Sequence, residues 1–142
     1  MRAWVAVLFL GCAPTVPTLF ARATAAANAH QLEDALGHYD AIAARRDARE
    51  PDQALALLEA ARLCDQLSDL IGARQRLESA VVKQAPEVAA SIEFYLAEHL
   101  RVEDRGRALN LYYRAASTAE KQGGGFPYQA AMDRIVEMAH AR

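Results

Sequence analysis

The sequence is poor in the residues that build sheets, disulfide frameworks and nucleic-acid surfaces. Aromatic residues make up only 7% of its 142 residues, and β-branched residues are sparse beside abundant alanine. This composition favours close-packed helices over strands. Two cysteines argue against a disulfide framework. A net charge of −2, with no Lys/Arg-rich run, leaves nothing to neutralise phosphates and argues against nucleic acid as a partner.

Motifs for catalysis are also missing. The chain contains no Gly-x-Ser-x-Gly, no phosphate loop, no dinucleotide-type glycine fingerprint and no His-Glu-x-x-His. The run Gly123 to Gly125 lacks the lysine of a phosphate-binding loop. We therefore expect a protein that is not an enzyme and that uses no cofactor.

The first residues have the composition of an export signal. Arg2 is followed by an uncharged stretch from Ala3 to Ala21, which is typical of the basic and apolar regions of a secretory signal. Pro14 and Pro17 argue against a continuous spanning helix. We predict a signal and linker over residues 1–23, a helical domain over residues 24–142, and a location in the bacterial cell envelope on the periplasmic side.

Two ways of processing this signal remain open. The run Phe9-Leu10-Gly11-Cys12 resembles a bacterial lipoprotein box, which implies cleavage before Cys12, lipid attachment to its thiol and a membrane anchor, with the outer membrane as one location for it. The alternative is cleavage after Ala21-Arg22-Ala23, a small-x-small site, which leaves a soluble periplasmic protein. In either case we expect Cys64 to be a buried thiol on an apolar helix face.

Proline, aspartate and glycine divide the remainder into about six segments of helical length. Apolar residues recur at helical spacing from Leu32 to Ala43, and again in five later segments. Pro51 and Pro86 suit first helical turns, and Asp69 and Asp104 suit N-caps. The last segment is amphipathic and runs from Tyr128 to Ala139. Short connections between helices predict that sequence neighbours pack antiparallel.

An internal repeat favours an open stack over a closed bundle. Asp69, Ala73 and Leu77 recur 35 residues later as Asp104, Ala108 and Tyr112. The stretches 67–77 and 107–116 resemble the tetratricopeptide family and its Sel1-like relatives, and the best repeats fall within residues 51–122. The resemblance implies a short all-α superhelix of about six antiparallel helices, with the last helix as a cap.

Tetratricopeptide stacks bind peptides on the concave face formed by the first helix of each hairpin. Carried over to this sequence, the resemblance implies a peptide-binding set: Leu55, Arg62, Gln66, Glu93, Ala97 and Arg101. Tyr113, Phe126 and Tyr128 form a second candidate surface, with packing of the cap as the alternative. The implied partner is a protein or peptide, and the implied function is that of a scaffold or adaptor in envelope assembly or in a secretion or pilus apparatus.

One cluster of potential metal ligands needs a separate interpretation. His30, Asp34 and His38 share a helical face, but two turns place the histidines roughly 12 Å apart, so we interpret them as a solvated polar face and predict no metal site. The pair His99 and Glu103 is interpreted as a surface contact. The alternative functions are an envelope hydrolase or metal-handling protein using His30 and His38, and a self-associating structural protein.

Overall fold

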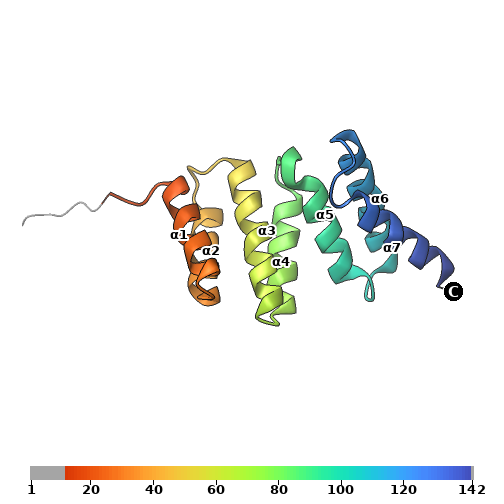
Figure 1. Cartoon of the computed structure of the whole chain (residues 1–142), viewed down its shortest axis with the longest axis horizontal. Coiled ribbons are helices and arrows are strands. Elements are labelled where there is room, and N and C mark those ends of the chain that lie inside the picture. The colour runs from red at the N-terminus through yellow and green to blue at the C-terminus, as the bar shows by residue number, and fades with distance from the viewer. Residues whose placement is uncertain (1–11, 142) are drawn as a thin grey trace, which may run out of the picture.

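The computed structural model describes residues 12–141, which form seven α-helices and no strand. Figure 1 shows the helices standing in a row along the long axis of the molecule. The all-α prediction is confirmed. The helices are α1 (Val16–Asn28), α2 (Leu32–Ala44), α3 (Glu50–Gln66), α4 (Leu70–Val81), α5 (Pro86–Leu100), α6 (Arg105–Lys121) and α7 (Tyr128–His140).

Capping residues begin the two helices that the repeat predicted most clearly. Asp69 accepts a hydrogen bond from the backbone N–H of Gly72 at 2.9 Å, and Asp104 accepts one from Arg107 at 3.0 Å. Each carboxylate satisfies a backbone donor that has no partner inside the helix. A Cβ atom at Gly72 would lie 2.0 Å from the Asp69 carboxylate, so a larger residue there would force this side chain to shift.

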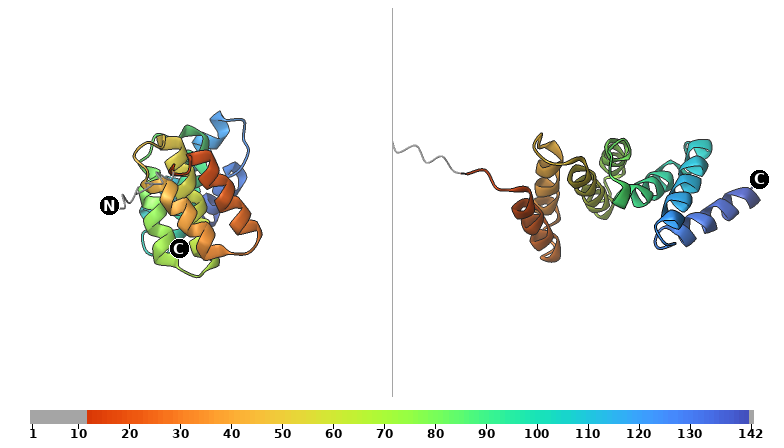
Figure 2. Two further views of the ribbon diagram at one scale, coloured as in Figure 1. Left: turned by 90° about the vertical axis from the view of Figure 1, so that its left-hand side faces the viewer. Right: turned by 90° about the horizontal axis from the view of Figure 1, so that it is seen from above.

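Three antiparallel hairpins, α1–α2, α3–α4 and α5–α6, stack side by side, and α7 closes the row against α6. Side-chain pairs link alternate helices: Arg76 of α4 reaches Asp40 of α2, and Arg134 of α7 reaches Glu98 of α5. The odd-numbered helices thus form one layer and the even-numbered helices the other, as the views in Figure 2 allow the reader to follow. This is the arrangement of a tetratricopeptide-like superhelix.

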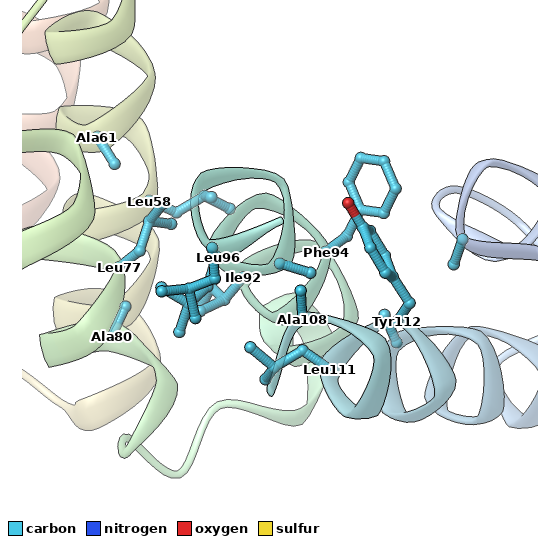
Figure 3. Packing of buried hydrophobic residues seen from close by; sticks show 14 of the residues in the cluster. Leu58, Ala61, Leu77, Ala80, Ile92, Phe94, Leu96, Ala108, Leu111 and Tyr112 are labelled. Carbon is cyan, nitrogen blue, oxygen red and sulfur yellow. The ribbon is translucent and has the colours of Figure 1, made fainter. Parts of the chain in front are cut away.

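Alanines and leucines fill the space between successive hairpins. Figure 3 shows Leu77 of α4 close to Ile92 and Leu96 of α5, with Ala108 and Leu111 of α6 on the other side. All five are buried. The small residues let the helix backbones approach, while the leucines and Ile92 fill the gaps between hairpins.

The folded region begins earlier than the boundary predicted at residue 24. Helix α1 starts at Val16, and its Leu19 and Ala23 are buried in a second core cluster with Tyr39 and Ile42 of α2. Pro17 lies in the first turn of α1, where proline starts a helix instead of interrupting one. Residues 12–141 therefore contain seven helices where the sequence predicted about six.

Part of the predicted export signal lies outside the described residues, including Phe9, Leu10 and Gly11 of the lipoprotein-like box. Cys12 is described and is exposed four residues before α1. Within residues 12–141, no helix has both the length and the apolar character needed to cross a bilayer.

Candidate protein-binding surface

The layer of odd-numbered helices presents one continuous side of the stack, which we call the odd-helix face. Helices α3 and α5 are joined on it by Asp65 and His99, whose side chains approach to 3.0 Å. Helices α5 and α7 are joined by Glu98 and Arg134 at 2.8 Å. These contacts hold α3, α5 and α7 in one surface.

A groove of about 360 Å³ lies between α1 and α3 at the N-terminal end of this face. Phe20 and Ala27 of α1 form one wall, Leu55 of α3 forms the other, and the ring of Tyr39 packs edge-on against Phe20 with centroids 6.2 Å apart. Polar groups stand among these apolar side chains. The full lining is Phe20, Thr24, Ala27, Asn28, Tyr39, Leu55 and Glu59.

A cationic and aromatic row continues the face toward α7. The guanidinium of Arg62 on α3 lies over the ring of Tyr95 on α5, 5.9 Å from its centroid. Phe126, in the loop before α7, packs against Phe94 and Tyr95 at 5.5 and 6.0 Å between ring centroids. Phe126 remains 61% exposed. A large aromatic side chain held by neighbours and left in solvent is typical of a protein-binding anchor.

Four of the six predicted peptide-binding residues are accessible. Leu55 lines the groove, Arg62 covers Tyr95, and Gln66 is exposed at the end of α3. Arg101 is exposed at the far end of α5, where it lines a depression of about 210 Å³ with Glu137 of α7. Arg101 therefore lies beside α7, away from the groove that contains Leu55.

Ala97 and Glu93 are the two exceptions. Ala97 is completely buried and Glu93 is 5% exposed, so neither side chain is available to a ligand on the odd-helix face. The side of α5 that bears Ala97 and Glu93 packs toward α6, while Tyr95, roughly half a turn away around the helix, lies on the open side. Tyr95 is half-buried and packs against the core cluster.

Glu93 instead forms an ion pair within the hairpin, in which Glu93 is buried and Arg114 is exposed. Its Oε1 lies 2.8 Å from Nη2 of Arg114 on α6, and its Oε2 is buried without a hydrogen-bond partner among the described residues. Burial raises the pKa of Glu93, and the charge and hydrogen bond of Arg114 only partly oppose that rise. Burial therefore disfavours the ionised form of Glu93 inside the stack.

The remaining sequence candidates are dispersed. Tyr113 is exposed on α6, while Tyr128 is half-buried against the core and Phe126 belongs to the row with Tyr95. His99 pairs with Asp65, and Glu103 pairs with Arg74, so the predicted pair of His99 and Glu103 is not observed.

No metal centre emerges from the side chains of residues 12–141. No three His, Cys, Asp or Glu side chains lie close enough together to hold an ion. His30 lies outside the helix that carries His38, in the turn between α1 and α2, with a φ of 57°. Cys64 is buried, as expected from its apolar face, and burial raises the pKa of its thiol.

Sequence reasoning missed Phe20, Tyr95 and the position of Phe126 in the aromatic row. Phe20 fell within the predicted leader, and Tyr95 and Phe126 are 31 residues apart in the sequence. The adjacent aromatics Phe94 and Tyr95 were the one available signal, because two neighbouring residues of a helix point in different directions. Comparison with known protein families and with curated proteins finds no match for this chain.

Proposed function

We propose that the protein is a tetratricopeptide-like scaffold that binds a segment of another protein on its odd-helix face. The observation that carries this proposal is the row of Arg62, Tyr95 and Phe126 beside the groove that contains Leu55, in which Arg62 and Phe126 are exposed and Tyr95 is half-buried. Arginine and tyrosine are enriched among residues that dominate binding energy. The groove offers apolar contacts, and Thr24, Asn28 and Glu59 offer hydrogen bonds to a peptide.

We further propose that this scaffold acts in the bacterial envelope as an adaptor for assembly or for a secretion or pilus apparatus, anchored by lipid at Cys12. The geometry of α1 favours processing before Cys12 over cleavage after Ala23. Cleavage after Ala23 would remove Leu19, which is buried, and would divide α1. Cleavage before Cys12 would leave α1 whole and keep the cysteine exposed.

Photo-crosslinking in cells tests the binding surface. A photoreactive phenylalanine analogue in place of Phe126 is expected to form adducts with a partner, and the same analogue in place of Ile71 is the matched control. Ile71 is 73% exposed on α4, in the opposite layer. The Phe126 adduct should fall sharply when Arg62→Glu and Tyr95→Ala are introduced together. Equal adducts from both positions, or adducts insensitive to those changes, would contradict the proposal.

Metabolic labelling with palmitate tests the anchor. We expect label in the wild-type chain and none in Cys12→Ser, with Cys64→Ser as the control that keeps its label. A mature chain beginning at Thr24 would instead show that the small-x-small site is used. The metal-handling alternative gains no support from residues 12–141, which bring no three potential ligand side chains together.

A further inference from the structure

Two residues of α6 occupy positions whose equivalents on α4 bind the following hairpin. On α4, Arg74 pairs with Glu103, and Glu78 pairs with Arg107 through two contacts of 2.6 Å. These pairs attach α4 to the hairpin that follows it. The 35-residue repeat places Leu109 and Tyr113 of α6 at the positions of Arg74 and Glu78. Tyr113 is 55% exposed, so the side of α6 that would attach a further helix is not fully covered.

Helix α7 presents an apolar side in the same direction. On α5, the residues that directly follow Ile92, Leu96 and His99 are Glu93, Ala97 and Leu100, and all three are buried. Helix α6 packs against α5, and Glu93 pairs with Arg114 of α6. On α7, the residues that directly follow the buried Ala131, Ile135 and Met138 are Met132, Val136 and Ala139. Val136 is 51% exposed, Ala139 is exposed and Met132 is half-buried.

We propose that these two helices form a docking site for an amphipathic helix of a partner protein, seated against α7 as α6 is seated against α5. We call this surface the open end and define it by Leu109, Tyr113, Met132, Val136 and Ala139. The helices that fill the equivalent positions, α4 and α6, carry alanines spaced around one large residue. The partner helix needs the same stripe, because small residues permit the close approach seen between α5 and α6.

Charge at the rim of the open end specifies the partner further. Asp133 borders Val136 on α7, and it contacts Gln129 but pairs with no cation among residues 12–141. Glu120 lies seven residues after Tyr113, on the same side of α6, and is exposed. The carboxylates at this end of the surface select a helix that carries Lys or Arg beside its apolar stripe, while Arg105, which donates to the carbonyls of Met138 and Ala141, lies at the other end.

The same features disfavour a second copy of this chain as the occupant. Two α7 helices packed antiparallel would bring their Asp133 edges together, which places like charges side by side. Each α7 is roughly 20 Å long, so a strip about 10 Å wide would bury on the order of 400 Å² in total, against about 1,200 Å² for the smallest stable interfaces. A single partner helix contacts α6 as well as α7.

Peptide binding to the full chain tests this site. The probe is a fluorescein-labelled peptide with the sequence of residues 104–122, which has four basic and two acidic side chains and the alanine stripe of α6. We expect saturable binding with a dissociation constant below about 100 µM by fluorescence anisotropy. Val136→Asp should weaken binding roughly tenfold or more, because it introduces a charge into the apolar contact.

Val102→Asp is the matched control, because Val102 is 90% exposed in the turn between α5 and α6. This variant should bind the peptide as the wild type does, and circular dichroism should show that both variants are folded. Three results would overturn the proposal: no saturable binding, binding unaffected by Val136→Asp, or a dimer in analytical ultracentrifugation that Val136→Asp dissociates. The last result would identify a second copy as the occupant.

Discussion

Arg134 of α7 donates a hydrogen bond from Nε to Oε1 of Glu98 on α5, at 2.8 Å. The hydroxyl of Tyr112 on α6 donates to the same oxygen. One carboxylate therefore joins three helices at the C-terminal end of the stack. Burial alone would raise the pKa of Glu98, but the hydrogen bonds from Arg134 and Tyr112 outweigh it and lower that pKa below its ordinary value.

Replacing Glu98 should weaken the attachment of α7. Glu98→Gln is expected to lower the free energy of unfolding by about 1–3 kcal/mol at pH 7. Because the folded-state pKa is lowered, the ionised group stabilises the fold above the unfolded pKa near 4.5, and this stabilisation is lost as the pH falls through the folded pKa. Urea denaturation from pH 7 to pH 3 measures the difference in the free energy of unfolding between the wild type and Glu98→Gln. This difference should become smaller below pH 4.5. Glu120→Gln, on an exposed position of α6, is the control that should leave stability unchanged.

Glu93 predicts the opposite pH dependence. Its raised pKa means that the ionised carboxylate destabilises the fold at neutral pH, and that this penalty diminishes as the pH falls through the folded pKa toward 4.5. Glu93→Leu should therefore raise the free energy of unfolding by about 1 kcal/mol at pH 7, with a smaller gain at pH 5. Arg114 is largely exposed and remains hydrated when its partner is lost.

The companion variant Arg114→Met should lower the free energy of unfolding by about 2–4 kcal/mol, because it leaves the buried Glu93 without a cation. Urea denaturation at both pH values measures the two variants. If Glu93→Leu and Arg114→Met lower the free energy of unfolding by the same amount, the ion pair is net stabilising. That result would contradict this interpretation.

The close contact of α5 and α6 predicts strong sensitivity at Ala115. This residue is completely buried, so Ala115→Arg would overpack the interface and bury a charge. The free energy of unfolding should fall by roughly 3 kcal/mol or more, with a lower midpoint of thermal unfolding. Ser117→Arg, at an exposed position of the same helix, should move the midpoint little. An unchanged midpoint for Ala115→Arg would place this face of α6 outside the core.

The early start of the folded region predicts a role for Leu19. This side chain is 6% exposed in the cluster formed by α1, α2 and α3, so Leu19→Ala should lower the free energy of unfolding by about 2–4 kcal/mol. Arg22→Ala, on the exposed side of α1, is the control. If Leu19→Ala has no effect on urea denaturation, residues 16–23 do not belong to the domain.

Much of the fold was accessible from sequence because its signals are local. Asp69 and Asp104 cap their helices as predicted, and Pro51 and Pro86 lie in the first turns of α3 and α5. Helix α1 was missed because its first eight residues, 16–23, lie within the stretch that was interpreted as a leader. The candidate surface was less predictable, since Tyr95 and Phe126 meet only after α5 and α7 are packed.

The sequence by itself determined that the chain is helical, where most helices begin, and that a 35-residue unit recurs from α4 to α6. Only the tertiary structure decided which sides of those helices remain in solvent. The physical reason is that each of these helices has more than one side that could be buried. The packing of the neighbouring helices determines which side is buried. Around α5, the packing of α3, α4, α6 and α7 buries Ala97 and leaves Tyr95 partly accessible. At the end of the row, no further helix among residues 12–141 packs against α7, and Val136 therefore remains in solvent.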